Sequence, residues 1–416
     1  MDHLNEPLEG LLVLEFSQFL AAPSAGLRLA DLGARVIKIE RPQGGDACRK
    51  LVLKNLWVGD DSLLFHTINR NKESYTADLK KPEDLAAVKA LIGKADILTH
   101  NFRPGVMEKI GLEYASVKAI NPTIVYAEVT GYGKEGPWKD KPGQDLLLQS
   151  LSGLAHLSGN SDSPQPFGLA IADMMCGAHL VQGILAALIQ RSSTGEGAHV
   201  EVSLMESILD FRFEFLTTWL NGGGLPAKSK VNHAHALLGA PYGIYQTQDG
   251  YVALAMSDLK QVGLATGITS LLDHTQDPFE DRDAIKREIA ARLIQERTDD
   301  WLSRLREYKL WVMPVLDWQQ LRKEPAYQSL HMEQEITTSS GSMLRAIRGA
   351  IHIDGQALYS SKAAPLLGEN TEAINQEFFD ARPVHLAILP SLILVSSSPD
   401  LPALCAWPIW GQRLSR

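Results

Sequence analysis

Residues 11–40, LLVLEFSQFLAAPSAGLRLADLGARVIKIE, decide the fold of this chain. The first six of them form an apolar run typical of a buried strand, and residues 34–40 form a second such run. Between the two runs, residues 21–32 carry the small and apolar side chains of a packed helix, and Gly33 stands where that helix should end. This order of strand, helix and strand predicts two parallel strands joined by a right-handed crossover.

The same alternation of strands and helices continues along the chain. We expect helices over residues 82–94 and 114–120, and strands over residues 96–100 and 123–129. Repeated units of this kind predict an α/β fold, a doubly wound, mostly parallel and Rossmann-like sheet with helices on both faces. The large domain built on this sheet is expected to take up residues 1–221.

A glycine-rich break at Asn221-Gly222-Gly223-Gly224-Leu225-Pro226 is the predicted domain boundary. A smaller α+β domain is expected over residues 222–323. It opens with two alternating strands joined at Asp249-Gly250, which is a strong hairpin signal, and continues with helices between residues 282 and 308. Residues 324–380 are then expected to return to the large domain.

Composition excludes several classes of protein. The 416 residues carry 40 basic and 49 acidic side chains, a net charge of -9, so charge gives no indication of nucleic-acid binding. Three cysteines form no disulfide framework, and the acidic N-terminus lacks the apolar core of a signal peptide. No run of about 18 apolar residues suggests a membrane span. We therefore expect a cytoplasmic protein without a membrane partner.

The sequence contains no complete binding motif for a common cofactor. Residues 131–136 match G-x-G-x-x-G, but the loop residues 137–143 follow where a dinucleotide fingerprint must open a helix. The first turn of the β-α-β unit, residues 17–23, has no glycine, so NAD binding is not expected. His233 and His235 lie close together without further clustered ligands, and we predict no metal site.

Asp173 is the candidate reactive residue. It stands between an apolar loop, residues 166–172, and a helix rich in small residues, 174–191. A carboxylate at the positive end of a helix among apolar neighbours suits a nucleophile or an acid/base group. Aspartate is also a preferred helix N-cap, a role that needs no chemistry. Position alone leaves both interpretations open.

Six short stretches, taken in order and at their spacing, resemble the class III (CaiB/BaiF-type) CoA-transferases. That family includes formyl-CoA and acetyl-CoA:oxalate CoA-transferases, and its superfamily includes carnitine CoA-transferase and α-methylacyl-CoA racemase. The resemblance covers residues 8–379, with the oxalate/formyl group as the branch most alike. It is carried by residues 31–42 (DLGARVIKIERP), 101–105 (NFRPG), 131–137 (GYGKEGP), 172–173 (AD), 194–197 (TGEG) and 240–243 (APYG).

The resemblance implies a covalent mechanism with Asp173 as the nucleophile. The carboxylate would attack an acyl-CoA thioester to give a mixed anhydride, and CoA would then form an aspartyl-CoA thioester. A free carboxylic acid, including dicarboxylic acids, would finally collect the CoA. CoA and acyl-CoA are thus substrates, and no permanently bound cofactor is implied. The resemblance also implies a homodimer whose two chains interlock.

The resemblance further implies a set of CoA contacts. They fall in the first β-α turn, at the end of the second strand, around the adenine and phosphates, and in the loop after the fourth strand. Basic members of the set suit the phosphate charges of CoA in a net acidic protein. The implied residues are Phe19, Leu20, Ala21, Arg41, Ala77, Asp78, Leu79, Lys80, Asn101, Phe102, Arg103, Lys109, Asp140, Lys141, Pro142 and Gly143.

The chain departs from the family pattern at several positions, which leaves the acyl group open. Leu20 stands for a glutamine of the formyl-CoA enzymes, Lys109 for an arginine and Gln144 for a glutamate, and their glycine-rich lid is not clearly reproduced. An α-methylacyl-CoA racemase would need two acid/base groups, and Gln144 occupies the position of its histidine. That substitution argues against the racemase alternative. A non-catalytic CoA-binding protein is the other alternative.

The end of the chain does not resemble the family. The resemblance fades after residue 371, and residues 381–416 are rich in apolar side chains, proline and serine. We expect them to form an atypical, poorly ordered tail.

Overall fold

A six-stranded parallel sheet forms the centre of the protein in the computed structural model, which describes residues 6–159, 163–273 and 276–379. The tail predicted for residues 381–416 lies outside the described residues. The strands run in the order β5-β2-β1-β6-β7-β8, and all neighbouring pairs are parallel. Their bounds are β1 Leu12–Phe16, β2 Arg35–Glu40, β5 Glu73–Thr76, β6 Ile97–His100, β7 Val125–Thr130 and β8 Ala198–Ser203.

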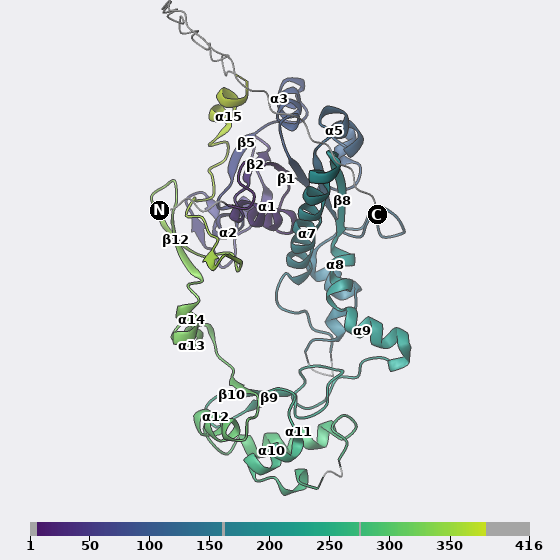
Figure 1. Ribbon diagram of the computed structural model, residues 1–416, viewed down its shortest axis with the longest axis vertical. Coiled ribbons are helices and arrows are strands. Elements are labelled where there is room, and N and C mark those ends of the chain that lie inside the picture. Colours follow the sequence, from purple (N-terminus) through teal and green to yellow (C-terminus); the bar gives the residue numbers. More distant parts are fainter. Residues whose placement is uncertain (1–5, 160–162, 274–275, 380–416) are drawn as a thin grey trace, which may run out of the picture.

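Helices cover both faces of this sheet, as the β-α alternation predicts (Figure 1). One apolar core lies between the sheet and α1, α7 and α8, and a second lies between the sheet and α3, α4, α5 and α15. The mostly parallel α/β sheet is thus confirmed. The helix bounds are α1 Ala21–Asp31, α2 Leu63–Asn69, α3 Pro82–Ile92, α4 Val106–Lys109, α5 Tyr114–Ile120, α6 Asp145–Leu151, α7 Ile171–Thr194, α8 Leu204–Phe211 and α15 Thr371–Phe378.

Strand β1 shows why the first apolar run is central. Side chains alternate between the two faces of a strand, so Val13 enters the core beneath α1 and α7 while Leu12 and Leu14 enter the opposite core. All three are buried. A strand that is apolar on both faces must be covered on both, which places β1 in the interior of the sheet.

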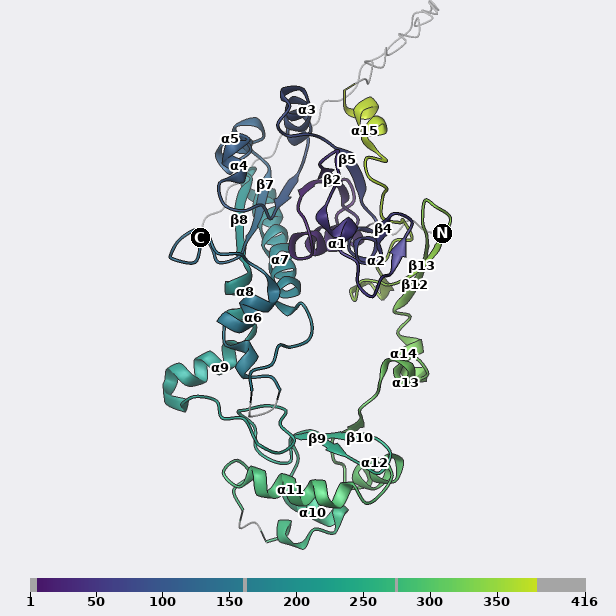
Figure 2. The same ribbon diagram turned by 180° about the vertical axis from the view of Figure 1, so that it is seen from behind.

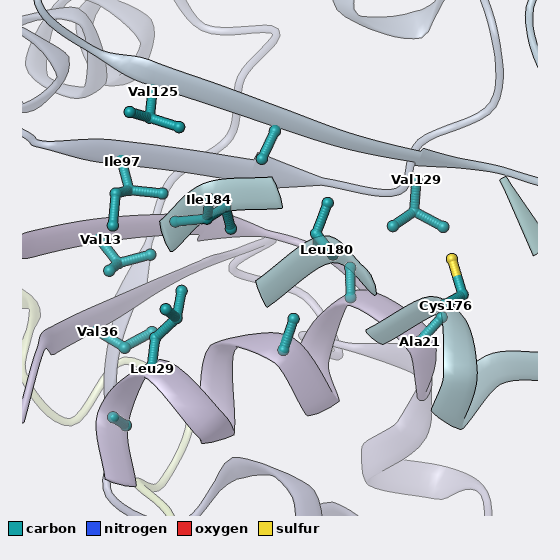
Figure 3. Close-up of a cluster of buried hydrophobic side chains, with 14 of the residues drawn as sticks. Val13, Ala21, Leu29, Val36, Ile97, Val125, Val129, Cys176, Leu180 and Ile184 are labelled. Carbon is teal, nitrogen blue, oxygen red and sulfur yellow. The ribbon is translucent and has the colours of Figure 1, made fainter. Parts of the chain in front are cut away.

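Helices α1 and α7 pack closely because α7 carries a glycine at their crossing. A side chain at Gly177 would lie 2.2 Å from Ser24 Oγ and 2.7 Å from the carbonyl oxygen of Ala21. Figure 3 shows Ala21 of α1 beside Cys176 of α7 in this core. The second turn of α7, which contains Gly177, is therefore held next to the first turn of α1.

We expect Gly177→Val to lower the free energy of unfolding by about 1–3 kcal/mol, because the added side chain forces the two helices apart. Chemical denaturation with far-UV circular dichroism measures the loss. The matched control is Ala178→Val, one residue along on the exposed side of α7, which should change the stability by no more than about 0.5 kcal/mol. Equal losses in the two variants would contradict the close crossing.

A second body of structure follows the large sheet and is joined to it by two runs of chain (Figure 1). It contains a three-stranded sheet in the order β11-β10-β9 with its own apolar core. The antiparallel pair β9–β10 confirms the hairpin predicted at Asp249-Gly250. The domain limits 222–323 and 324–380 remain predictions. Helix α9, Phe213–Thr218, directly follows α8. The elements of the second body are β9 Gly243–Gln246, β10 Tyr251–Leu254, α10 Leu259–Thr266, α11 Arg282–Leu293, α12 Thr298–Glu307 and β11 Val312–Pro314.

The chain then returns to the large sheet and covers its edge strand β5. The side chain of Asn370 accepts a hydrogen bond from Ser74 N–H, and that of Thr371 accepts one from Thr76 N–H, both at 2.9 Å. These bonds occupy main-chain groups that an exposed edge would leave free. The returning elements are α13 Trp318–Leu321, α14 Pro325–Ser329, β12 Glu333–Thr337, β13 Met343–Ile347, β14 His352–Ile353 and β15 Gln356–Ala357, before α15.

Helix α7 is long and apolar enough to cross a membrane by length and composition, and it is the one such helix in the described ranges. The expectation from apolar run length did not single it out. Core helices pass the same test, and α7 packs against α1, α8, β7 and β8. Its buried side chains include Leu180 and Ile184, which lie against the sheet in Figure 3. These contacts favour a core helix.

Candidate active site

The turn between β1 and α1 lies at the carboxyl edge of the parallel sheet and is held in an unusual shape. Phe19 has a left-handed backbone, with φ of 64°, and its side chain is 50% exposed. Such a conformation is disfavoured for a bulky residue and persists only where the surroundings enforce it. Asp46 supplies part of that enforcement, because its carboxylate accepts a hydrogen bond from Phe19 N–H at 3.1 Å.

Asn101 fixes the residue before Phe19. Its carboxamide oxygen accepts from Gln18 N–H at 2.8 Å, and its carboxamide nitrogen donates to the Gln18 carbonyl at 2.7 Å. The polar atoms of the Asn101 side chain are thus committed to the turn. Sequence reasoning placed Asn101 among the CoA contacts, whereas the structure shows a side chain that shapes the turn where CoA contacts were predicted.

We expect Asn101→Ala to raise KM for acyl-CoA about tenfold, because two hydrogen bonds of about 0.5–1.5 kcal/mol each no longer hold the turn. Steady-state kinetics with varied acyl-CoA measures the change. Asn101→Asp keeps the acceptor for Gln18 N–H but turns a carboxylate oxygen toward the Gln18 carbonyl oxygen, so its KM should rise at least as much as that of the alanine variant. A wild-type KM in the alanine variant would show that the turn does not depend on Asn101.

Buried charges lie directly beneath this turn. The Lys38 ammonium is 2.8 Å from Glu15, 2.9 Å from Asp46 and 2.8 Å from the Ser17 carbonyl oxygen. The Lys72 ammonium also contacts Glu15, at 2.8 Å. The side chains of Glu15, Lys38, Lys72 and Asp46 are all fully shielded from solvent. Asp46, which sequence reasoning missed, therefore links a buried ionic cluster to the backbone of the turn.

Most of the predicted CoA contacts gather along this carboxyl edge. Because the strands are parallel, Arg41 after β2, Ala77–Lys80 after β5 and Asn101–Arg103 after β6 all follow strand ends at the same edge as the turn. Arg41 and Arg103 are exposed there, and Arg41 donates a hydrogen bond to the Gly45 carbonyl. Whether these residues bind CoA stays a prediction.

The loop after β7 is brought close to the same edge by two glycines. A side chain at Gly143 would lie 2.8 Å from the Gly131 Cα atom, so only the absence of a Cβ permits this approach. No helix follows the G-x-G-x-x-G run until α6, which confirms that residues 131–136 do not open a helix. The predicted contacts Asp140, Lys141, Pro142 and Gly143 all lie on this exposed loop.

Asp173 lies in the first turn of α7 and is not its N-cap. The helix begins at Ile171, three residues before the predicted start, and the N-cap is Ala170, which has no side-chain acceptor. The capping interpretation of Asp173 was therefore wrong. Helix α7 crosses α1 at Gly177, where it contacts Ala21, one turn after Asp173. Asp173 therefore lies in the N-terminal turn of α7, beyond this crossing. Residues 166–172 are apolar and carry no helix-start signal, so the sequence does not show that the helix begins at Ile171.

The surroundings of Asp173 favour its protonated form. Burial, and then the negative charge of Asp145 on α6, raise the pKa of the Asp173 carboxyl from 3.8 to about 7. The N-terminus of a helix favours a charged carboxylate, but these two effects outweigh it. One turn along, burial raises the pKa of the Cys176 thiol to about 12, so this thiol is neutral at physiological pH. Asp173 is the better nucleophile of the two.

A second ionisable cluster lies at the strands β6, β7 and β8 and is an ion-pair network. Glu128, His199 and Glu201 could hold a metal by their spacing. The Lys134 ammonium, however, lies 2.5 Å from Glu128 and 2.7 Å from Glu201, so a cation already pairs with both carboxylates. We assign no metal to it. The histidine pair of the sequence also has ordinary partners: His235 pairs with Glu214, and His233 faces the Leu157 carbonyl.

The fold agrees with the comparisons to known proteins. The family model for CoA-transferase family III matches residues 8–371. The acetyl-CoA:oxalate CoA-transferase of Acetobacter aceti is 33% identical over 387 residues, which cover 89% of this chain and 96% of that protein. The succinate–glutarate CoA-transferase of Agrobacterium fabrum is 29% identical over 390 residues, covering 91% and 97%.

Solved structures agree with the sequence relatives. A CaiB/BaiF family protein from Brucella suis superposes with a TM-score of 0.78 at 30% identity, covering 90% of this chain and all of that one. Rv3272 from Mycobacterium tuberculosis superposes with a TM-score of 0.76 at 27% identity, covering 88% and 98%. The chain belongs to CoA-transferase family III. Its relatives act on acyl-CoA and acids such as oxalate and glutarate, and the family resemblance predicted from the sequence is confirmed.

Proposed function

We propose that this protein transfers CoA from an acyl-CoA donor to a free carboxylic acid, with Asp173 as the covalent nucleophile. The observation that carries the proposal is the half-buried Asp173 carboxylate in the first turn of α7, a helix packed at Gly177 against the first turn of α1. The β1–α1 turn, at the carboxyl edge of the sheet, leads directly into that turn of α1. Ligands of open α/β sheets bind at this edge.

The proposed steps balance without any added reactant. An Asp173 oxygen attacks the thioester carbonyl, which forms a C–O bond, breaks the C–S bond and releases CoA thiolate from the mixed anhydride. The thiolate attacks the aspartyl carbonyl and releases the donor acid, leaving an aspartyl-CoA thioester. The acceptor carboxylate attacks that thioester, and the thiolate then attacks the acceptor carbonyl of the second anhydride. Asp173 is regenerated as a carboxylate.

The pocket for the acyl group must exclude water, since an anhydride hydrolyses. Residues before α7, including Phe167 and Leu169, present apolar side chains there, and both are exposed in the single chain. The relatives with oxalate, succinate and glutarate in their names favour a small acid, including a dicarboxylic acid, as the acceptor. The CoA moiety is proposed to lie along the carboxyl edge, over the contacts predicted from the sequence.

We further propose that the working form is a homodimer with interlocked chains. Apolar side chains are exposed on the second body and on the returning segment, among them Trp311 at 69%, Met313 at 65% and Trp318 at 82%. Large exposed apolar surfaces are typical of interfaces. Two separate runs of chain join the bodies, on opposite sides of the view in Figure 2. Light scattering after size exclusion tests this proposal, and a stable monomer would contradict it.

The test of function is a matrix of acetyl-, succinyl-, formyl- and oxalyl-CoA against mono- and dicarboxylic acids. We expect at least one pair to give a new acyl-CoA by chromatography, with ping-pong kinetics. Deuterium wash-in at the α-carbon without loss of CoA would instead indicate a racemase. Gln144, which occupies the position of the racemase histidine, is the N-cap residue of α6 and cannot act as a base. CoA binding without either reaction would contradict both enzymes.

A further inference from the structure

The N-terminal end of α7 is held by a side chain from another helix. The Asp145 carboxylate, at the start of α6, accepts a hydrogen bond from Ala172 N–H at 2.7 Å. The first N–H groups of a helix lack partners within it, and the N-cap Ala170 offers no side-chain acceptor. Asp145 therefore caps α7 from a different helix. The N–H group that it binds belongs to Ala172, the residue before Asp173. Figure 2 shows α6, α7 and α8 gathered in this region.

The second Asp145 oxygen is occupied as well. It accepts from the Gln149 carboxamide nitrogen at 2.5 Å, one turn further along α6. That nitrogen also donates to the Leu169 carbonyl at 2.9 Å, and the Gln149 oxygen accepts from Phe167 N–H at 2.7 Å. Gln149 is buried. Together, Asp145 and Gln149 bind three main-chain groups of the segment that leads into α7, those of Phe167, Leu169 and Ala172.

We propose that Asp145, aligned by Gln149, is the positioning residue that fixes the Asp173 carboxylate for attack, an inference that rests on the proposed function. The geometry requires a carboxylate. Position 145 must accept two N–H groups at once, one from Ala172 and one from Gln149. An asparagine there would turn an NH₂ group toward one of these donors. Hydrogen bonds to a charged acceptor are also about twice as strong as neutral ones.

Charge supports the same role. Asp145 adds to the effect of burial in raising the pKa of Asp173 to about 7. Cys176 on α7 is a further titratable group near Asp173. Burial raises the pKa of its thiol to about 12, and the charge of Glu206 on α8 acts in the same direction. The activity of the free enzyme should therefore rise with pH as Asp173 loses its proton near pH 7. Removal of the Asp145 charge should move this rise to lower pH.

The experiment compares Asp145→Asn with the wild type in steady-state CoA transfer across pH 5–9. We expect kcat to fall about 10–100-fold, because a displacement on the order of 1 Å has effects of this size, while KM for acyl-CoA changes by less than about threefold. The acid limb of kcat/KM should move to lower pH by about half a unit or more. A purely structural role would lower the folded fraction but would leave the pH profile unchanged.

A double variant tests the geometry without removing the charge from the site. In Asp145→Asn/Gln149→Glu, the new carboxylate can accept from the introduced asparagine amide and from Phe167 N–H, and the asparagine oxygen accepts from Ala172 N–H. Only the bond from Gln149 to the Leu169 carbonyl is lost. We expect kcat to recover at least about fivefold relative to Asp145→Asn. The control is Asp317→Ala, which removes the exposed aspartate cap of α13 and should keep the wild-type kcat and pH profile.

Wild-type kcat and an unchanged pH profile in Asp145→Asn would overturn the inference, and so would a loss of activity that only tracks the folded fraction. The proposed function fails separately. If Asp173→Asn keeps its transfer activity, Asp173 is not the nucleophile. If Asp173→Asn is inactive and Asp145→Asn is normal, only the positioning role of Asp145 is wrong.

Discussion

Replacing Asp173 by asparagine is expected to lower kcat for CoA transfer by at least about 1,000-fold. The amide keeps the shape of the side chain but cannot form an anhydride or a CoA thioester. The neighbouring Cys176 thiol cannot take over, because burial keeps it protonated at neutral pH. Initial rates with the best pair of substrates, measured over long incubations, give the residual activity.

The control for this variant is an acidic residue of the same region with a different environment. Asp210 on α8 is largely exposed and pairs with His179 of α7 at 3.3 Å. We expect Asp210→Asn to keep kcat within about twofold, since an exposed ion pair contributes little. Both variants should elute and melt as the wild type does. Transfer activity in Asp173→Asn above about a tenth of the wild-type rate would contradict its role as nucleophile.

Replacing Glu15 by glutamine is expected to lower the free energy of unfolding by about 3–5 kcal/mol, the largest loss of stability that we predict. The variant leaves the buried Lys38 and Lys72 ammonium groups with too little negative charge. Lys38 keeps Asp46, whereas Glu15 is the only carboxylate paired with Lys72 within the described part of the chain. Urea denaturation followed by fluorescence measures the loss.

A second replacement separates charge from packing. Glu15→Gln/Lys72→Met removes one charge of each sign and should recover at least half of the lost stability, because Lys38 then faces Asp46 alone. The exposed pair Arg345–Glu335 is the control, and Arg345→Ala should leave the unfolding midpoint unchanged. A loss in Glu15→Gln no larger than in this control would show that the cluster does not stabilise the fold.

The same cluster predicts how stability depends on pH. Burial alone would raise the pKa of Glu15, but Lys38 and Lys72 outweigh it and hold the pKa below its ordinary value of 4.5. The folded state thus keeps the carboxylate charged where the unfolded state takes up a proton. This contribution is present above pH 4.5 and is lost as the pH falls below that value.

The sequence was sufficient for the parts of the fold that depend on local pattern. The strands β1, β2, β6 and β7 and the helices α1, α3 and α5 follow apolar periodicity, and the hairpin at Asp249-Gly250 follows turn chemistry. Strand β5 was not predicted, because its four residues, Glu73–Thr76, are mostly polar. Its edge is covered by Asn370 and Thr371, from the far end of the described chain, and no local pattern shows that contact.

The sequence also predicted only part of the candidate site. The family motifs indicated Asp173, but the start of α7 was placed too late because Asp145, on a different helix, caps it. Asp46 and Asn101 shape the first turn through contacts across 27 and 83 residues. A hint was present in Asp145 and Gln149, spaced four residues apart on one helix, which is the spacing of neighbouring side chains. Their targets on the loop before α7 needed the structure.

The most direct test of the central claim is to trap the covalent intermediate. The wild-type protein is incubated with acyl-CoA, quenched with hydroxylamine and digested, and the peptide that contains Asp173 is examined by mass spectrometry. We predict a hydroxamate on Asp173 that depends on acyl-CoA and is absent from Asp173→Asn. An unmodified Asp173 peptide, recovered while the same sample transfers CoA at its full rate, would contradict covalent catalysis by this residue.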